Sequence, residues 1–351
     1  MNCYFSDKIK VMSFVAILLV LYGHSGFHDY PNEIAGMAFN YYLQEFVGAK
    51  ITRCTIPLFF AISGYLFFLH TEGGIDIVIQ KIRRRVRTLL IPFFFACLFL
   101  PLFYVVLDFV PNVARFVNFG GFSENLKLPI SKVLTSLFFD SGSGTPWAFH
   151  LWFLRDLIIM VALSPILYYI KCTKISGWVV CLMLYGLSLM EIPILPFDGL
   201  VWFMFGAYYL DYLEKIRHRR IIVAMFFVLC VIELILADWE ARFPFIQTPI
   251  VLMGVVSLWS IYDWIVPESF NLSQHKVLSL ACGFSFFIYL YHEPTLNVVR
   301  KLLVLPFGHN SFSFAFSYLA SPWVFTLLFV PIGMLLKKYI PAIYSTIVGG
   351  R

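Results

Sequence analysis

The stretch Val11–His24, VMSFVAILLVLYGH, is apolar almost throughout and ends in a histidine. Fourteen residues of helix rise about 21 Å, most of the roughly 30 Å hydrocarbon core of a bilayer. Lys8 and Lys10 precede the run, as basic residues precede the core of a signal peptide. No convincing small-residue cleavage site follows, so we expect a transmembrane helix that stays in the chain.

The composition of the whole chain extends this expectation. Of its 351 residues, 60% are hydrophobic and 13% are charged, whereas a soluble domain carries about 25% charged residues. Apolar runs such as 11–22 and 221–237 must lie in lipid or against other helices. The net charge of +6 comes from basic residues near the expected helix ends, where membrane topology accounts for them without a nucleic acid partner.

We therefore predict an all-α, polytopic transmembrane bundle of about ten spans, forming a single domain over residues 1–351 with no appended soluble domain. The expected spans lie near residues 10–26, 52–70, 88–108, 150–170, 177–190, 196–212, 220–237, 247–265, 280–299 and 322–340. With a cytoplasmic N-terminus, most of the 26 Lys and Arg residues fall on the inner side. Because such a bias sets orientation, we expect both termini to be cytoplasmic.

The longest outer connection is expected over residues 109–149. Within it, residues 130–139 are apolar but too short to span, which suits an interfacial or re-entrant helix. This connection either covers an outward-facing cavity or is a plain capping loop. The seven cysteines are scattered without CxxC pairing, so we expect small core residues and no metal site.

His24 is the sharpest chemical feature, because an ionisable residue within a membrane is costly and is a functional candidate by default. It lies about 21 Å along the expected helix from Lys10, beyond the midplane of the bilayer. Burial favours the neutral imidazole, the form that accepts a proton from a hydroxyl. The alternative is a hydrogen-bonded, inert histidine at the membrane interface.

Two basic features could hold an anionic donor. Lys10 lies about 40° in azimuth from His24, so the two side chains share a helix face; alternatively, Lys10 is an ordinary topology anchor. The cluster Arg83–Arg87 contains four arginines, whose guanidinium groups bind phosphate in bidentate fashion. The alternative for this cluster is contact with lipid headgroups.

Two polar groups lie in the second and ninth expected spans. Gly64 permits close approach of another helix, and Ser63 could hydrogen-bond a substrate or a neighbouring helix. His292 and Glu293 form a candidate polar centre, and the following Pro294 should kink the helix. A structural role is open for each of them.

The fourth expected span begins with the stretch His150–Asp156, HLWFLRD. Within it, Arg155 and Asp156 place opposite charges at a helix entry, where they must be paired or hydrated. Functional and structural explanations are equally open for this pair.

These stretches together resemble the acyltransferase-3 family of bacterial membrane O-acyltransferases. The matching stretches, in chain order, are the helix ending in His24, Ile56–Tyr65 (IPLFFAISGY), the Arg83–Arg87 cluster running into Leu90–Pro92, His150–Asp156, and Ser285–His292 (SFFIYLYH). Each motif is short, but their order and spacing cover nearly the whole chain.

The resemblance implies a ten-helix fold in a bacterial plasma or inner membrane. It also implies a cytosolic acyl-CoA donor, an acceptor approached from the other side, and no bound cofactor. His24 would be the catalytic histidine, and the Arg-x-Arg element that holds the coenzyme A phosphates would be Arg85 with Arg87, or Arg83 with Arg85. The family commonly has arginine where this chain has Ser13, and the nearest basic residue on that face is Lys10. Further residues match stretches that the family keeps and are candidates for supporting or acceptor-binding roles: Ser63, Trp152, Arg155, Asp156, His292 and Glu293.

The resulting hypothesis is an O-acetyltransferase that moves an acetyl group from acetyl-CoA to a hydroxyl of a cell-surface polysaccharide or a lipid-linked sugar. The main rival is a transporter or flippase of a glycan or lipid intermediate. Its mark would be matched broken helices in two related halves, which the sequence lacks. A membrane scaffold without chemistry is a third alternative. The acyl chain length, the acceptor and the oligomeric state are left open.

Overall fold

The computed structural model describes residues 3–27, 34, 36–110, 131, 135–136, 138, 148–190, 195–236 and 246–350. Within these ranges every regular element is helical and no strand occurs. The expected outer connection 109–149, with its predicted interfacial helix over 130–139, lies largely outside the described residues, as does residue 351.

Every expected span is largely helical in its described part, and the ninth is covered by two helices. The principal helices are α1 (Cys3–His24), α3 (Ala38–Glu45), α4 (Thr55–Phe68), α5 (Ile75–Arg85), α6 (Ile91–Asp108), α10 (Trp152–Cys172), α11 (Gly177–Ser188), α12 (Phe197–Tyr209), α13 (Arg219–Ile235), α15 (Gln247–Ile265), α16 (Lys276–Tyr291), α17 (Thr295–Val304), α18 (Ser311–Tyr339) and α19 (Pro341–Ile347). Short 3₁₀ or π-helical segments join or precede several of them: η1 (Phe46–Ile51), η2 (Thr52–Cys54), η3 (Val86–Leu90), η4 (Phe149–Leu151), η5 (Leu210–Lys215) and η7 (Leu272–Gln274).

Five helical segments among the described residues are long and apolar enough to cross a membrane: Ala38–Phe68, Ile75–Leu107, Phe149–Cys172, Gln247–Ile265 and Ser311–Tyr339. Two further apolar helices, α11 and α16, are shorter. The chain is therefore a polytopic α-helical membrane protein, and the count of ten spans with both termini inside stays a prediction.

Three boundaries differ from the expectation for clear physical reasons. The second and third expected spans are the C-terminal parts of longer continuous helices. The π-helical segment η1 joins α3 through η2 to α4, and η3 joins α5 to α6. The ninth expected span is divided into α16 and α17 around Pro294, which lacks the N–H that a continuous helix needs. The helix of the tenth expected span, α18, begins at Ser311, eleven residues earlier than expected, where Asn310 and Ser313 form a capping box.

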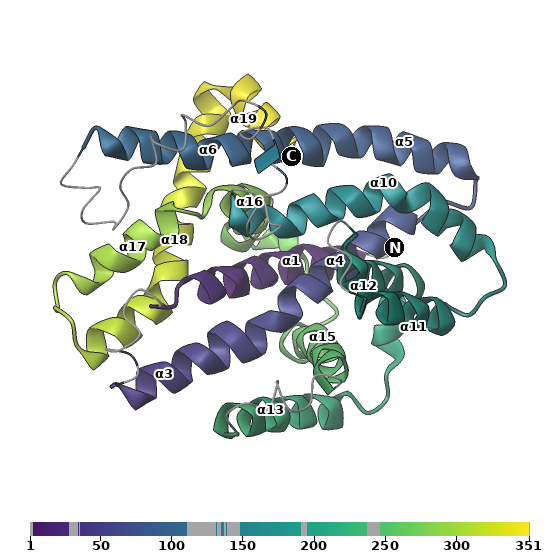
Figure 1. The fold of residues 1–351 in the computed structure, drawn as a ribbon, viewed down its shortest axis with the longest axis horizontal. Coiled ribbons are helices and arrows are strands. Elements are labelled where there is room, and N and C mark those ends of the chain that lie inside the picture. Colours follow the sequence, from purple (N-terminus) through teal and green to yellow (C-terminus); the bar gives the residue numbers. More distant parts are fainter. Residues whose placement is uncertain are drawn as a thin grey trace.

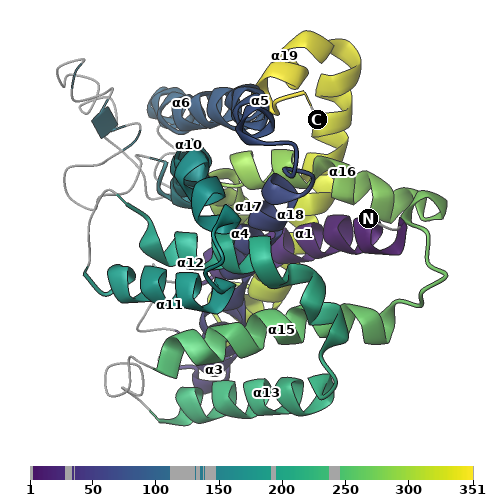
Figure 2. The same cartoon turned by 90° about the vertical axis from the view of Figure 1, so that its right-hand side faces the viewer.

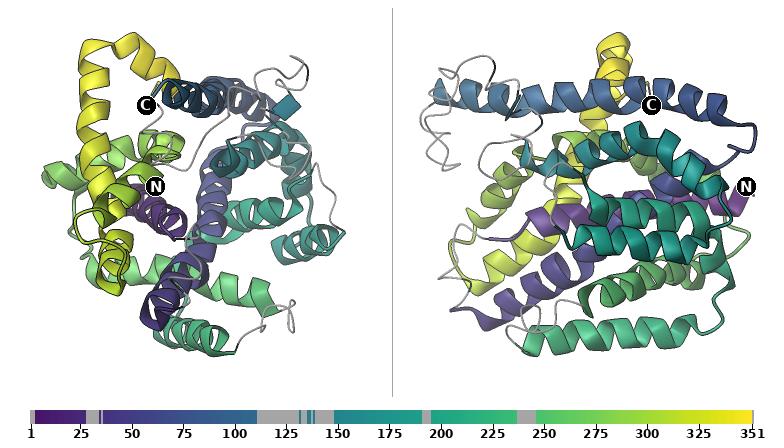
Figure 3. Two further views of the ribbon diagram at one scale, coloured as in Figure 1. Left: turned by 60° about the vertical axis from the view of Figure 1, so that its left-hand side comes forward. Right: turned by 45° about the vertical axis from the view of Figure 1, so that its right-hand side comes forward.

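Helix α1 lies in the middle of the bundle, and the other helices surround it in all views (Figures 1, 2 and 3). It contacts α4, α15, α16, α17 and α18 together with the segments η1 and η2. Leu21 and Ala16 of α1 are almost fully buried. The apolar run that opens the sequence is thus the central helix of the fold, and α5 and α6 form a rod at the edge (Figure 1).

Two glycines let α4 and α12 cross in direct backbone contact. A Cβ atom added to Gly64 would lie 1.8 Å from the carbonyl oxygen of Phe203, and one added to Gly206 would lie 1.9 Å from that of Ala61. Small residues permit this approach between membrane helices. The packing role predicted for Gly64 is confirmed.

A buried ion-pair network holds the N-terminal half of α1. The Lys8 side chain is fully buried, and its Nζ atom lies 2.6 Å from Glu214 and 2.7 Å from Asp263. Arg219 also pairs with Asp263, at 2.5 Å, and the indole of Trp259 donates to Glu214 at 2.7 Å. The ion pairs therefore join the beginning of α1 to η5 and to the end of α15.

A second buried pair joins η2 to α13 and α15. Arg53 pairs with Glu233, whose side chain is fully buried, and it also donates to Gln247 at 2.8 Å. Glu233 lies within the run 221–237, which the sequence analysis treated as purely apolar. That reading was wrong at this position, because a charge inside the bundle is tolerated when its partner comes from another helix.

Gly206→Ala tests the crossing of α4 and α12. The added methyl group would meet the backbone of Ala61, so we expect the melting temperature of the purified protein in detergent to fall by about 3 °C or more, from an overpacking cost of about 1–3 kcal/mol. The matched control is Gly186→Ala, since no atom lies within 4 Å of a Cβ added there. Equal melting temperatures for the two variants would contradict the packing role.

Lys8→Met tests the buried network. Removing the ammonium group leaves the Glu214 carboxylate without a cationic partner, while Asp263 keeps Arg219. We therefore expect a loss of about 3–5 kcal/mol in the free energy of unfolding, measured by titration with SDS in mixed micelles. Lys10→Met is the control, because Lys10 is 56% exposed and an exposed pair contributes about 0–1 kcal/mol. Equal losses in both variants would argue against the network.

Candidate functional site

The end of α1 brings His24 against the turn between α16 and α17. The Nδ1 atom of His24 lies 3.8 Å from a carboxylate oxygen of Glu293. The rings of His24 and His292 are 5.0 Å apart, and those of His292 and His150 are 4.9 Å apart. Three histidines and a glutamate from separate parts of the sequence therefore meet at one place, which we call the histidine cluster.

Hydrogen bonds fix the two inner histidines. The Nδ1 atom of His292 lies 2.7 Å from the carbonyl oxygen of Tyr289, and the Nε2 atom of His150 lies 3.3 Å from that of Leu290. Each of these nitrogens must carry the proton, because a carbonyl oxygen accepts. The remaining nitrogen of each ring has no hydrogen-bond partner among the described residues. Both rings are buried while the side chain of His24 is 28% exposed, so His24 is the member that a substrate can reach.

The local sequence explains this geometry. Helix α16 ends at Tyr291, and the chain turns at Glu293 and Pro294 before α17 begins. Within one straight helix, His292 and Glu293 would point about 100° apart. The turn lets both side chains approach the end of α1.

A cavity of about 170 Å³ lies beside α1. It is lined by Ser13 and Ile17, which precede His24 in the helix by about two turns or more. Its polar lining consists of Ser13, Ser63, Arg85, Ser285 and Tyr289. The remaining lining residues are apolar and come mainly from α1, α4, α10 and α16. The hydroxyl of Tyr289 donates to the carbonyl oxygen of His150 at 3.2 Å. This tyrosine therefore belongs to the wall of the cavity and contacts the histidine cluster.

The four predicted arginines do not share one environment. Arg85 is half-buried and lines this cavity together with Ser63. Arg83 and Arg87 are exposed. Ser13, which stands where the family commonly has arginine, lines the same cavity as Arg85. The arrangement singles out Arg85, which both alternative Arg-x-Arg assignments include.

Lys10 lies elsewhere. Its ammonium group pairs with Asp7 at 3.0 Å, and it lines a different cavity with Asp7 and Ser279. The structure does not bring Lys10 and Arg85 to the same cavity. Its role in donor binding stays a prediction.

The remaining candidates at the start of α10 form a local group. Arg155 donates to Asp156 at 2.9 and 2.7 Å and to the carbonyl oxygen of Phe138 at 3.4 Å. Trp152 is exposed to 36%. The charges of Arg155 and Asp156 are thus paired, as tolerance in a membrane requires, and any direct contact of these three residues with a substrate stays a prediction.

His24, His292 and Glu293 also offer ligand atoms for a metal ion, all within 4.8 Å of one another. Around tetrahedral Zn²⁺, ligand atoms at about 2.0–2.1 Å from the metal lie closer together than this. The side chains would have to move inward to hold a metal. The expectation of a site without metal stays a prediction.

His150 is the member of the histidine cluster that sequence reasoning missed. The stretch containing it was recognised, but only Trp152, Arg155 and Asp156 were selected. Its pairing with His292 joins residues 142 positions apart, which no periodicity can reveal. The signal present in the sequence was that both recognised stretches contain a terminal histidine: His150 begins one, and His292 ends the other.

Comparisons with known proteins agree with this assembly of motifs. The family model described as an acyltransferase domain, of the acyltransferase-3 type, matches residues 7–338. The chain is 22% identical over 368 residues to the succinoglycan biosynthesis protein ExoH of Rhizobium meliloti (strain 1021), covering 100% of this chain and 94% of that protein. No solved structure matches it. Since this family model matches nearly the whole of a helical chain in which several recognised motifs meet at the histidine cluster, the chain belongs to the acyltransferase-3 family.

Proposed function

We propose that this protein is an O-acetyltransferase of the bacterial cell membrane, which moves an acetyl group from cytosolic acetyl-CoA to a hydroxyl of a surface polysaccharide or a lipid-linked sugar. The main support is that one central helix, α1, carries His24 at one end and lines the cavity with Arg85 nearer the other. The name of the relative ExoH, a succinoglycan biosynthesis protein, supports a polysaccharide as the acceptor.

In the proposed reaction His24 is the general base. Its Nδ1 faces Glu293 at 3.8 Å, so the other ring nitrogen receives the proton of the acceptor hydroxyl as that oxygen attacks the thioester carbonyl. The carboxylate of Glu293 orients the ring and stabilises the imidazolium that forms, as an acidic residue does in a serine protease triad. The imidazolium then returns its proton to the departing thiolate of coenzyme A.

The donor would bind from the opposite side of the bundle. The guanidinium of Arg85 would hold a phosphate oxygen of acetyl-CoA in a charge-assisted hydrogen bond, and exposed Arg83 and Arg87 would attract the anion to that surface. The acyl end would pass along the cavity lined by Ser13, Ser63 and Tyr289 toward His24. The bound acyl-CoA is a co-substrate, and no further cofactor is needed.

His24→Ala tests the proposed base. We expect acetyl transfer to fall by about 10²–10⁴-fold, because the acceptor hydroxyl loses its proton acceptor. The measurement is mass spectrometry of O-acetyl groups on the surface glycans of cells that carry each variant, with transfer from radiolabelled acetyl-CoA in isolated membranes as the kinetic assay. His218→Ala, at an exposed histidine, is the control. Full O-acetylation in cells that carry only His24→Ala would defeat the proposal.

Arg85→Gln tests the donor site. We expect the KM for acetyl-CoA to rise about tenfold or more, because a hydrogen bond to a charged group contributes about 1.5–3 kcal/mol. Arg84→Gln is the matched control, since Arg84 is the exposed neighbour in the same cluster and should leave the KM nearly unchanged. A KM for Arg85→Gln equal to that of Arg84→Gln would remove Arg85 from the donor site.

A further inference from the structure

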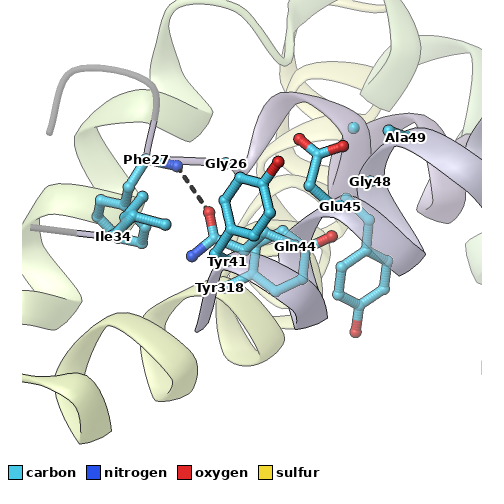
Figure 4. A pocket seen from close by; sticks show the side chains of 11 residues that line it. Gly26, Phe27, Ile34, Tyr41, Gln44, Glu45, Gly48, Ala49 and Tyr318 are labelled. Atoms are coloured by element: carbon cyan, nitrogen blue, oxygen red, sulfur yellow. Dashed lines mark hydrogen bonds between the residues drawn. The ribbon is translucent and has the colours of Figure 1, made fainter. Parts of the chain in front are cut away.

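A second cavity, of about 310 Å³, lies beside the last turn of α1. We call it the outer cavity. Its walls come from the last turn of α1, from α3 and η1, and from α18, and Figure 4 shows the residues that line it. They are Tyr22, Gly23, Gly26, Phe27, Ile34, Tyr41, Gln44, Glu45, Gly48, Ala49 and Tyr318. Its volume is near the lower end of the range for small-ligand pockets.

Two hydrogen-bonding groups in this cavity have no protein partner among the described residues. The hydroxyl of Tyr318 is buried, on a residue with no exposed surface, and makes no hydrogen bond. The amide nitrogen of Gln44, a half-buried residue, is also buried and without a partner, although the amide oxygen accepts from the backbone N–H of Phe27 at 3.0 Å (Figure 4). By contrast, the hydroxyl of Tyr22 is satisfied, since it donates to Leu319 and accepts from Trp323.

Buried polar groups without partners carry a free-energy cost that a bound polar ligand removes. The outer cavity combines these two donors with the carboxylate of Glu45, an acceptor, and with the ring of Tyr41. A sugar ring presents hydroxyls, which accept from the donors and donate to the carboxylate, and an apolar face, which packs on an aromatic ring. A simple anion would be repelled by Glu45, and an alkyl chain would leave both donors unsatisfied.

The position of the cavity relates it to the histidine cluster. Gly23 lines it, and the next residue is His24. Side chains one position apart on a helix point about 100° apart, so His24 and the outer cavity lie on different sides of the same turn. They are separated by about the width of one helix, roughly 10 Å, which a short oligosaccharide spans.

We propose that the outer cavity is an acceptor subsite that binds a sugar unit next to, or near, the unit that is acylated at His24. This inference rests on the proposed function, and it adds that the acceptor is recognised as an oligosaccharide rather than as a single sugar. Tyr318 and Gln44 hold the hydroxyls of that sugar, and Glu45 accepts from another. These are binding residues, and the chemistry stays with His24.

The test uses two conservative changes in the full-length protein. Tyr318→Phe removes the hydroxyl, and Gln44→Glu keeps the oxygen that accepts from Phe27 while it removes the amide donor. Tyr339→Phe is the matched control, because Tyr339 lies on the same helix and is 68% exposed. The probes are oligosaccharides of graded length, released from the surface polysaccharide of a strain in which the gene is deleted, so that they lack the acyl group.

For the wild type, we expect the acceptor KM to fall as the oligosaccharide grows beyond one sugar unit. Each variant should raise the KM for the longer probes by about five- to tenfold, as expected for one lost hydrogen bond, and should leave the KM for acetyl-CoA unchanged. Tyr339→Phe should behave as the wild type. An identical dependence on length in the Tyr318→Phe/Gln44→Glu double variant would show that the cavity holds water only, and would overturn the subsite.

Calorimetric binding separates the subsite from the proposed function. His24→Ala should bind the longer oligosaccharides without turnover, and adding Tyr318→Phe should raise the Kd by the same five- to tenfold factor. Equal Kd values refute the subsite. If the oligosaccharide binds in a manner that depends on Tyr318 but the wild-type protein transfers no acetyl group, the proposed function is refuted. The cavity is then still a sugar-binding site.

Discussion

The arrangement depends on one constraint: a charged side chain buried inside the bundle must be paired. Helix α1 meets this constraint at both ends. Lys8 is held by Glu214 and Asp263 near its beginning, and His24 lies beside Glu293 at its end. Since α1 also contacts five other α-helices among the described residues, these two attachments fix the position of its whole length. The distance between the cavity with Arg85 and the histidine cluster is thereby set by one rigid helix.

Much of the site could be predicted from the sequence. His24 was found because it ends an apolar run, and His292 and Glu293 were found because ionisable residues are costly in a span. Gly64 was recognised as a place of close helix approach. In each case the signal was local: a polar or small residue in an apolar segment needs a physical reason. Such residues can be recognised without knowledge of the tertiary structure.

The rest depends on which face of each helix turns inward, and the sequence does not contain that information directly. Lys8 and Lys10 are two residues apart and about 160° apart in azimuth, so one is buried and the other exposed. Lys10 was named from the sequence as a donor-binding candidate or a topology anchor, and Lys8 was not singled out, whereas the packing buries Lys8. The sequence likewise does not distinguish the burial of Arg85 from that of Arg83 and Arg87. The structure does, because α5 packs against α10 and leaves only Arg85 of these three half-buried. Pairs such as Arg53 with Glu233 and His150 with His292 join distant segments, which only the fold brings together.

The wall of the outer cavity at the end of α1 is made partly of two glycines. Gly23 lies against the backbone of Gly48, since a Cβ added to Gly23 would be 3.7 Å from the carbonyl oxygen of Gly48. A Cβ added to Gly48 would in turn be 3.0 Å from the hydroxyl of Tyr318. A methyl group on Gly48 would therefore displace the hydroxyl of Tyr318 and reshape the cavity, whereas one on Gly23 would make ordinary contacts. Under the proposed function, such a change at Gly48 would alter which acceptor binds and leave the base in place.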